Sequence, residues 1–305
     1  MKIVIVGASG FIGQHLGAHL GRQGLDVLGL DIRCDSAAVS RFPIQCCDCS
    51  SDEIVFDPPV DAVFYLAQAR CYRQHDADPS ALFSVNVQGA VRTMEAAVRS
   101  GARSFLYAST GNVYAPSFTP LSEDMQIAGY TPYAASKLAA ERSLQLWGDR
   151  INLINARLFG VFGPHQQTML VPKLMRRVIS GQPVSVAPRA DGAADQGGLR
   201  ISMTYVHDLV RWLSELCELT VAAPRHEPRT LNIASGEAVS IRQIAEAIGN
   251  LLSIAPRFEP GQTPRPGDLV ANVEDLRSLI DLKATRFEDA LRLTVDAAVP
   301  LESTP

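Results

Sequence analysis

The sequence predicts an α/β fold built on a parallel, doubly wound sheet. The chain opens with the continuous apolar run Met1–Val6, which ends at Gly7, and such a run is typical of a buried parallel strand. Leu16 and Leu20 then lie on one face of a helix. Strand-like and helix-like segments go on alternating through the first half of the chain. This alternation predicts parallel strands joined by right-handed crossovers.

The expected elements follow in order. In the first half, strands are expected at Val27–Leu30, Ala62–Leu66, Ser104–Ala108 and Ile151–Asn155. The helical spacing of apolar residues predicts helices over Ser80–Ser100 and Pro132–Trp147. The pattern changes near Gly163-Pro164. Beyond it we expect helices and strands in alternation, over Leu170–Ser180, Thr204–Val206, Asp208–Leu219, Leu231–Ala234 and Ser240–Leu252.

The turn after the first strand is rich in glycine, at Gly7, Gly10 and Gly13. Gly7 permits a tight turn, Gly10 lets the backbone approach a pyrophosphate, and Gly13 allows the helix to pack closely on the strand. The N-terminus of the helix then offers free amides and a partial positive charge to phosphates. A tight turn alone would explain a lone glycine triplet. Here strand, turn and helix occur in the order that a dinucleotide site requires.

Asp31 stands at the end of the second strand, where an acid accepts hydrogen bonds from the hydroxyls of an adenosine ribose. Its charge would repel a 2′-phosphate, so NAD is favoured over NADP, and Arg33 weakens that preference. We therefore expect a Rossmann domain that binds NAD over residues 1–165. A smaller, mixed α/β substrate domain is expected over 166–305, with segments that return to the first domain.

The composition narrows the class of protein. The chain has 305 residues, 47% of them apolar and 20% charged, which is ordinary for a soluble globular protein. A net charge of −4 without a Lys/Arg cluster argues against a nucleic-acid partner. No apolar stretch is long enough to span a membrane. The first strand begins at Met1 and leaves no room for a targeting segment, so we expect a cytoplasmic protein.

The six cysteines are expected to be reduced thiols in that compartment. Cys46, Cys47 and Cys49 lie close together around Asp48. No second pair follows at the spacing of a zinc site. We therefore expect no metal site.

Tyr133 and Lys137 lie one helical turn apart, after the strand that ends near Thr110. A phenol normally titrates near ~10. A nearby ammonium favours the phenolate and makes the tyrosine usable as an acid or base near neutral pH. A surface Tyr–Lys pair would look the same in the sequence, but the position directly after this strand favours a catalytic pair.

Together these motifs resemble those of the extended short-chain dehydrogenase/reductases, in the branch of NAD-dependent nucleotide-sugar epimerases and dehydratases. The resemblance covers nearly the whole chain and also rests on Ser109–Tyr114, Tyr205–Asp208, Asn232–Glu237 and Arg265–Asp268. It implies a homodimer that pairs the helices around 87–98 and 134–147. It also implies cofactor contacts from Gly7, Ser9, Gly10, Phe11, Ile12, Gly13, Asp31, Asp48, Cys49, Leu66, Ala67, Gln68, Asn86, Tyr133, Lys137 and Phe159.

The resemblance further implies a mechanism. Tyr133 takes a proton from a substrate hydroxyl, Thr110 hydrogen-bonds the same oxygen, and Lys137 holds the nicotinamide ribose. The carbon loses a hydride to NAD, and the resulting 4-keto sugar turns over and takes the hydride back on its other face. Dehydratases and decarboxylases of this branch place acidic residues directly after the threonine, where this chain has Gly111 and Asn112. We therefore expect a nucleotide-sugar 4-epimerase with a UDP-linked substrate.

The resemblance implies a substrate contact from Thr110. Contacts are also expected from Arg200 and Arg265, because a guanidinium fork suits a diphosphate. Gly160 and Met169 stand where that family commonly has asparagines that contact the diphosphate and the nucleotide. These two departures leave the identity of the nucleotide open.

Other functions stay open as well. An NAD(P)-dependent ketoreductase or dehydrogenase of a sugar or other small molecule would use the same trio with net hydride transfer. NAD retained through purification would favour the epimerase. A non-catalytic NAD-binding sensor would have no need of Thr110, Tyr133 and Lys137. The segment Arg189–Gly198, rich in Gly, Ala and Asp, is expected to be mobile without substrate.

Overall fold

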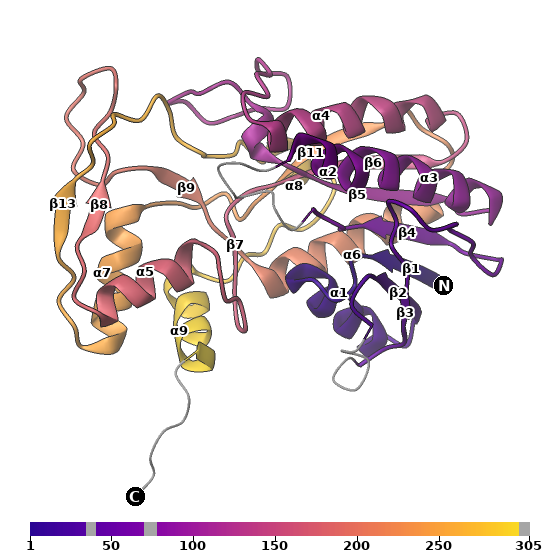
Figure 1. Cartoon of the computed structure of the whole chain (residues 1–305), viewed down its shortest axis with the longest axis horizontal. Coiled ribbons are helices and arrows are strands. Elements are labelled where there is room, and N and C mark those ends of the chain that lie inside the picture. The colour runs from indigo at the N-terminus through magenta and orange to yellow at the C-terminus, as the bar shows by residue number, and fades with distance from the viewer. Residues whose placement is uncertain (35–40, 70–77, 299–305) are drawn as a thin grey trace, which may run out of the picture. The chain divides into compact units, whose positions relative to one another are not determined.

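The computed structural model describes residues 1–34, 41–69 and 78–298 (Figure 1). The chain divides into two compact units. The first, here called the sheet unit, combines Met1–Ala115, Gln126–Leu158 and Val210–Leu231. The second unit combines Pro116–Met125, Phe159–Leu209 and the chain from Asn232 onward. Each unit is thus assembled from segments that are far apart in the sequence.

The sheet unit is built on seven strands in the order β11-β6-β5-β4-β1-β2-β3. All neighbours from β6 to β3 pair in parallel, which confirms the predicted sheet. The strands are β1 (Lys2–Val6), β2 (Asp26–Asp31), β3 (Ile44–Cys46), β4 (Ala62–Tyr65), β5 (Ser104–Thr110), β6 (Asn152–Leu158) and β11 (Arg229–Ile233).

The strand order fixes where this sheet can bind a ligand. From β1 the chain moves outward through β2 and β3, and then returns to the other side of β1 at β4. Sheets of this kind bind ligands at the carboxyl ends of the strands, at the point where the order reverses. The ends of β1 and β4, at Gly7 and Leu66, are therefore the expected binding edge.

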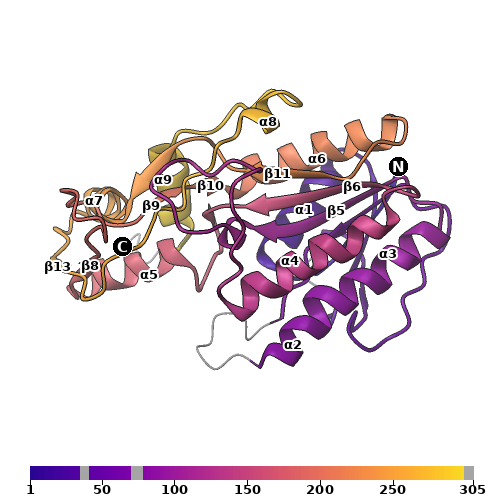
Figure 2. The same ribbon diagram turned by 90° about the horizontal axis from the view of Figure 1, so that it is seen from above.

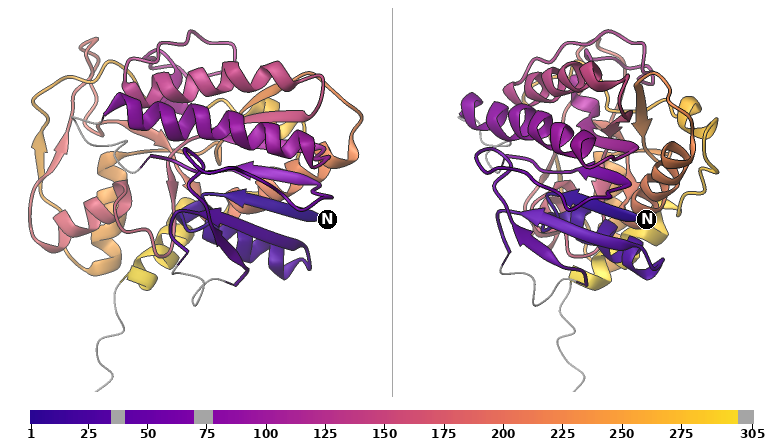
Figure 3. Two further views of the ribbon diagram at one scale, coloured as in Figure 1. Left: turned by 45° about the vertical axis from the view of Figure 1, so that its right-hand side comes forward. Right: turned by 90° about the vertical axis from the view of Figure 1, so that its right-hand side faces the viewer.

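Helices cover both faces of this sheet (Figures 2 and 3). On one face lie α2 (Pro79–Phe83), α3 (Ala90–Arg99) and α4 (Pro132–Leu144). On the other lie α1 (Phe11–Arg22) and most of α6 (Val206–Ala222). The hydroxyl of Ser214 in α6 donates a hydrogen bond to Gln23, directly after α1, at 3.1 Å. The predicted doubly wound architecture is confirmed.

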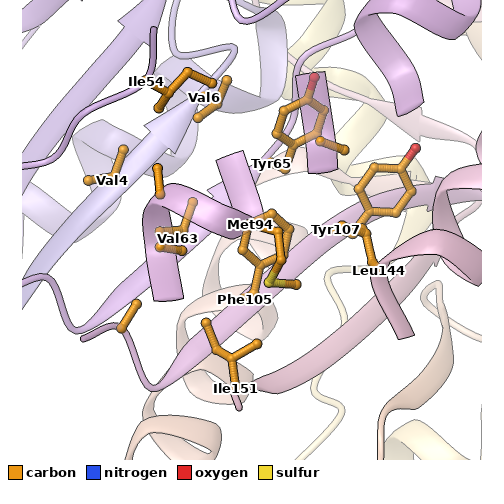
Figure 4. Close-up of a cluster of buried hydrophobic side chains, with 14 of the residues drawn as sticks. Val4, Val6, Ile54, Val63, Tyr65, Met94, Phe105, Tyr107, Leu144 and Ile151 are labelled. Carbon is orange, nitrogen blue, oxygen red and sulfur yellow. The ribbon is translucent and has the colours of Figure 1, made fainter. Parts of the chain in front are cut away.

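One core cluster of the sheet unit lies between the sheet and α3. Figure 4 shows Val4, Val63 and Phe105 of three strands together with Met94 of α3, and each of these side chains is 0% exposed. Burial of an apolar side chain of this size contributes roughly 1.5–3 kcal/mol. The nearly continuous apolar character of β1 and β4 follows from this burial on both faces of a parallel sheet.

The segment predicted as one helix over Ser80–Ser100 is interrupted in the structure. A π-helical stretch, Ser84–Gly89, separates α2 from α3. The hydroxyl of buried Tyr65 donates a hydrogen bond to the carbonyl of Val85 within this stretch. A Cβ at Gly89 would lie 2.5 Å from the same hydroxyl oxygen. A side chain that inserts into the helical ladder is a recognised cause of such an irregularity.

The second unit contains three small two-stranded sheets and several helices. The strand pairs are β7 (Val161–Phe162) with β10 (Thr204–Tyr205), β9 (Arg200–Ser202) with β12 (Ala238–Ser240), and β8 (Val184–Val186) with β13 (Phe258–Pro260). The helices are α5 (Leu170–Ile179), α7 (Ile241–Leu252), α8 (Glu274–Arg277) and α9 (Phe287–Ala298). Within the described residues, no helix in either unit has both the length and the apolar character needed to cross a membrane.

One expectation about the cysteines is wrong. Asp31 at the end of β2 pairs in register with Cys46 of β3, which brings the two strand ends together. Cys34 follows β2 with its Cα 5.1 Å from that of Cys46, and the two form a disulfide. The sequence does not reveal that these strand ends are neighbours, and the expectation of six reduced thiols therefore missed the pair. Cys71 lies outside the described residues.

Candidate active site

The glycine turn between β1 and α1 is required by close backbone contacts. Gly7 has a φ of +88°, and a Cβ there would lie 2.6 Å from the backbone nitrogen of Ala67. A Cβ at Gly13 would lie 2.3 Å from the carbonyl oxygen of Gly7. No side chain of the described residues caps α1 at Gly10, so the helix start presents its amides to a ligand. These amides belong to Phe11, Ile12 and Gly13.

Asp31 is held beside this turn by two backbone amides. Its carboxylate accepts hydrogen bonds from the nitrogen of Ser9 and from the nitrogen of Arg33, each at 2.9 Å. The Arg33 side chain donates back to the carbonyl of Ser9 at 3.0 Å. The acid is only 9% exposed, so its charge lies at the edge of the turn rather than in bulk solvent.

Just beyond the end of β4, Gln68 carries a buried polar group that has no partner among the residues the structure describes. Leu66 is bound through its amide to the carbonyl of Val6 at 2.8 Å, which keeps Leu66 and Ala67 against the glycine turn. The buried Nε2 of Gln68 has no hydrogen-bond partner among the described residues. Buried donors are nearly always satisfied, so an orphan at this edge fits a bound ligand. The glycine turn, Asp31 and Gln68 together fit a dinucleotide.

Asp48 and Cys49 follow β3. The backbone amide and hydroxyl of Ser50 donate hydrogen bonds to the Asp48 carboxylate, at 2.9 and 2.6 Å, and they lower the pKa of that carboxyl. Cys49 is buried with its sulfur 3.2 Å from the Tyr65 hydroxyl, and burial raises the pKa of the thiol to about 11. This thiol is therefore a packed, protonated group and not a nucleophile.

Tyr133 and Lys137 project from the first turns of α4. The hydroxyl of Thr131 caps this helix by accepting from the amide of Ala134 at 3.1 Å, and Pro132 follows as the first helical residue. The cap fixes where the helix begins and therefore where the two side chains point. Tyr133 is half-buried.

Lys137 is 2% exposed and donates a hydrogen bond to the carbonyl of Ala108 in β5 at 2.9 Å. Its nitrogen lies 5.0 Å from the centre of the Tyr107 ring. Burial lowers the pKa of Lys137 to about 7, while the nearby charge of Glu141 acts in the opposite direction. The ammonium is thus poised to change its charge near neutral pH.

Thr110 ends β5, two residues beyond the carbonyl that binds Lys137. It is 6% exposed, and its hydroxyl accepts from the amide of Asn112 at 3.2 Å. Gly111 and Asn112 form a short 3-10 turn and supply no titratable group. The sheet unit therefore places Thr110 at the end of β5 and joins Lys137 of α4 to the same strand two residues earlier, at Ala108.

Asn86 serves the geometry of the site from the π-helical stretch. It is fully buried, and its amide nitrogen donates to the hydroxyl of Ser136 at 2.9 Å. Ser136 in turn donates to the carbonyl of Tyr133 at 2.8 Å. The Asn86 side chain also accepts from the amide of Ala69 at 3.3 Å. Its predicted contact with the cofactor stays a prediction.

Of the predicted substrate residues, Arg200 and Arg265 lie in the second unit. Arg265 is 6% exposed; its Nε donates to Asp268 at 2.9 Å and its Nη1 to the carbonyl of Ala187 at 2.8 Å. Its Nη2 forms an ion pair with Asp195, inside the segment predicted to be mobile. All three nitrogens thus have protein acceptors. The exposed Arg200 is linked to this group through its amide, which binds Asp268 at 3.0 Å.

Phe159, the remaining predicted cofactor contact, is 1% exposed in the second unit.

The sequence did not point to a buried ion pair that includes Glu141, one helical turn after Lys137 on α4. Glu141 and Arg157 form an ion pair at 2.7 Å, with side chains 3% and 6% exposed. The only signal in the sequence was a glutamate one further turn along α4.

Comparison with known proteins identifies the family. A family model described as the NAD dependent epimerase/dehydratase family matches residues 3–234. Protein CapI of Staphylococcus aureus is 28% identical over 338 residues, which cover 97% of this chain and 98% of that protein. UDP-glucose 4-epimerase of Mycolicibacterium smegmatis is 27% identical, with 88% of each chain covered.

Solved structures agree over nearly the whole chain. MoeE5 in complex with UDP-glucuronic acid and NAD has a TM-score of 0.79 at 26% identity and covers 98% of this chain and 99% of its own. Thermus thermophilus UDP-glucose 4-epimerase in complex with NAD has a TM-score of 0.77 at 26% identity, with 97% and 98% covered. The family match spans more than half of the sequence and contains the glycine turn, Thr110, Tyr133 and Lys137. The chain belongs to the NAD-dependent epimerase/dehydratase family.

Proposed function

We propose that this protein is a nucleotide-sugar 4-epimerase that works through a 4-keto intermediate. The observation that carries the proposal is the arrangement at the end of β5. Thr110 ends β5, buried Lys137 donates to the carbonyl of Ala108 on the same strand, and Tyr133 lies one turn before Lys137 on α4; the next two positions after Thr110, Gly111 and Asn112, hold no acid or base. This set can remove and return the proton of one hydroxyl, and it has no additional acid or base for elimination of water.

The reaction assigns one task to each side chain. Tyr133 accepts the proton of the substrate 4-hydroxyl while a hydride leaves the carbon that carries this hydroxyl, so that a ketone forms. NAD supplies the acceptor and later the donor of that hydride. Thr110 hydrogen-bonds the reacting oxygen, and the Lys137 ammonium favours the phenolate form of Tyr133. After the sugar ring turns over, the hydride returns to the carbonyl carbon and the proton returns to the carbonyl oxygen.

Support for a UDP-linked substrate comes from the relatives, several of which are named UDP-glucose 4-epimerase. MoeE5 has been solved with UDP-glucose as well as with UDP-glucuronic acid. We propose that the sheet unit holds NAD and that Arg200 and Arg265 of the second unit meet the diphosphate. In that case Arg265 must exchange its ion pair with Asp195 for a phosphate oxygen.

The test is to incubate the purified protein with UDP-, GDP-, dTDP- and ADP-linked hexoses and with UDP-glucuronic acid, and to follow the anomeric signals by NMR. The proposal expects one sugar nucleotide to convert to its 4-epimer without added NADH. Conversion that consumes NADH in equal amount would instead identify a ketoreductase. Loss of water or of CO₂ from the substrate would overturn the proposal.

We also propose a cytoplasmic homodimer. Support comes from apolar side chains left exposed at the ends of two helices: Phe83, at the end of α2, is 38% exposed, and Leu146, in the turn after α4, is 78% exposed. Light scattering on the purified protein should give twice the mass of the 33.0 kDa chain.

The Cys34–Cys46 disulfide is unusual for the cytoplasm. Acid-trapping of thiols in intact cells would show whether the pair is oxidised there.

A further inference from the structure

Glu141 is a buried acid on the same helix as Lys137. The two residues lie one turn apart on α4 and are each 2% exposed. The hydrogen bond of Lys137 to the Ala108 carbonyl satisfies a donor but brings no opposite charge. Because a buried ammonium is costly without an anion, the nearest carboxylate matters for its charge.

The Glu141 carboxylate is held from three directions. Its Oε1 accepts from Nε of Arg157 at 3.0 Å, and its Oε2 accepts from Nη2 at 2.7 Å. The hydroxyl of Ser109 donates to Oε1 as well. Arg157 is in turn stacked on the Tyr114 ring, with its guanidinium carbon 4.8 Å from the ring centre. A bidentate pair of this kind fixes the position of the carboxylate.

We propose that Glu141 is a positioning residue for Lys137, because its carboxylate, locked by Arg157 and Ser109, sets the charge that Lys137 carries at neutral pH. The role of that charge in epimerisation rests on the proposed function. The charge itself does not, and it can be measured in the protein without substrate.

In the described part of the chain, the other groups near Lys137 include three tyrosines. Tyr107 of β5 lies under its nitrogen, Tyr65 of β4 stacks on Tyr107 with ring centres 5.9 Å apart, and Tyr133 lies one turn earlier on α4. Burial holds the pKa of Tyr107 and of Tyr65 well above the ordinary range, so both rings stay neutral. The 79–89 and 111–113 segments, which pack against α4, carry no charged residue.

On α3, the charged side chains are engaged elsewhere. Arg92 donates to the carbonyls of Ser50 and Ser51, Arg99 donates to that of Ile54, and Glu95 is exposed. Among the described residues of these elements, Glu141 is the charged side chain that acts on Lys137, and Arg157 is the ion-pair partner of Glu141. Their charges have opposite effects on the pKa of Lys137. Removing the anion lowers the pKa of Lys137, and removing the cation raises it.

The chain has only four lysines, Lys2, Lys137, Lys173 and Lys283, which makes a direct titration practical. Full-length protein labelled with ¹³C at lysine Cε gives four resolvable NMR signals, and Lys137→Met identifies one of them. In the wild type that signal should titrate with a midpoint of about 7. Glu141→Gln should lower the midpoint by about one unit, and Arg157→Gln should raise it by a similar amount.

Ser109→Ala is the matched control. It removes one contact of the same carboxylate but no charge, so the midpoint should stay within about 0.3 units of the wild type. A midpoint that is unchanged in Glu141→Gln, or shifted equally by Ser109→Ala, would show that the network is only structural. If circular dichroism shows that Glu141→Gln does not fold, Arg157→Gln decides alone, and a midpoint that does not rise overturns the proposal.

The consequence for catalysis is read from a pH profile. Lys137 acts in its charged form, so turnover falls as the pH rises through the pKa of the folded state. Glu141→Gln should shift this alkaline limb to lower pH by about one unit. If no sugar nucleotide is turned over, the proposed function fails while the NMR titration still tests the role of Glu141.

Discussion

Tyr130 and Tyr133 carry the same phenol three residues apart, in different surroundings. Tyr130 is 76% exposed, whereas Tyr133 is half-buried at the start of α4, one turn from Lys137. Tyr133→Phe should reduce turnover by roughly 100-fold or more, because it removes a general acid/base oxygen. Tyr130→Phe removes the same atom from an exposed site and should leave turnover unchanged.

Both variants keep the aromatic ring, so the melting temperature and NAD affinity should stay close to the wild type. Turnover is measured on the sugar nucleotide identified by NMR. Near-full activity in Tyr133→Phe would rule out the proposed proton transfer and reopen the possibility of a non-catalytic NAD-binding protein.

Asp31 should decide which dinucleotide binds. Its carboxylate is fixed by the amides of Ser9 and Arg33 at the edge of the glycine turn, where a 2′-phosphate would meet a like charge. NAD should bind at least about 10-fold more tightly than NADP by fluorescence titration. Asp31→Asn keeps an acceptor oxygen and removes the charge, so it should narrow this ratio. Tighter binding of NADP to the wild type would contradict the assignment.

Many of the site residues could be predicted because they follow from spacing within a single helix or turn. Tyr133 and Lys137 were recognisable because their spacing of four is a property of a single helix. The partner of Glu141 was not, because Arg157 lies on a strand that only the folded sheet places beside α4. The same is true of the buried contact between Cys49 and Tyr65.

At the element scale, α1 offers a matched pair of glycines. A Cβ at Gly13 would lie 2.3 Å from the Gly7 carbonyl oxygen, whereas a Cβ at Gly21 has no heavy atom within 4 Å among the described residues. Gly13→Ala should therefore destabilise the fold by about 1–3 kcal/mol, because backbone must move. Gly21→Ala should stabilise it by about 0.5–1 kcal/mol, because alanine favours a helix.

Urea unfolding monitored by circular dichroism measures both changes. Gly13→Ala should also weaken NAD binding, since the displaced backbone forms the phosphate turn. Equal stability of the two variants would show that α1 does not pack on β1 as described.

The long helices and strands of the sheet unit could be predicted because each contains enough apolar residues to show its period. The π-helical stretch Ser84–Gly89 was not, because its apolar spacing is nearly that of an α-helix and its cause, Tyr65, lies on β4. The strands of the second unit were largely missed for another reason. All six strands described there contain only two or three residues, too few to show a period of two.

On the scale of the whole molecule, the order of the seven strands places the ligand edge at the ends of β1 and β4. The sequence predicted this edge because the glycine turn and Asp31 mark it locally. The ion pair between Asp195 and Arg265 could not be predicted, since it joins residues 70 positions apart. The mobility of Arg189–Gly198 stays a prediction, and hydrogen exchange of that segment with and without UDP would measure it.

The central claim is that the sugar carbon loses a hydride and regains the same one. The most direct measurement uses the substrate with deuterium at C4, incubated with the enzyme in ordinary water and analysed by NMR and mass spectrometry. We predict that the 4-epimer forms with its deuterium retained at C4, because the hydride never exchanges with solvent. Loss of the deuterium to water during epimerisation would contradict it and would indicate removal and return of a proton at carbon instead.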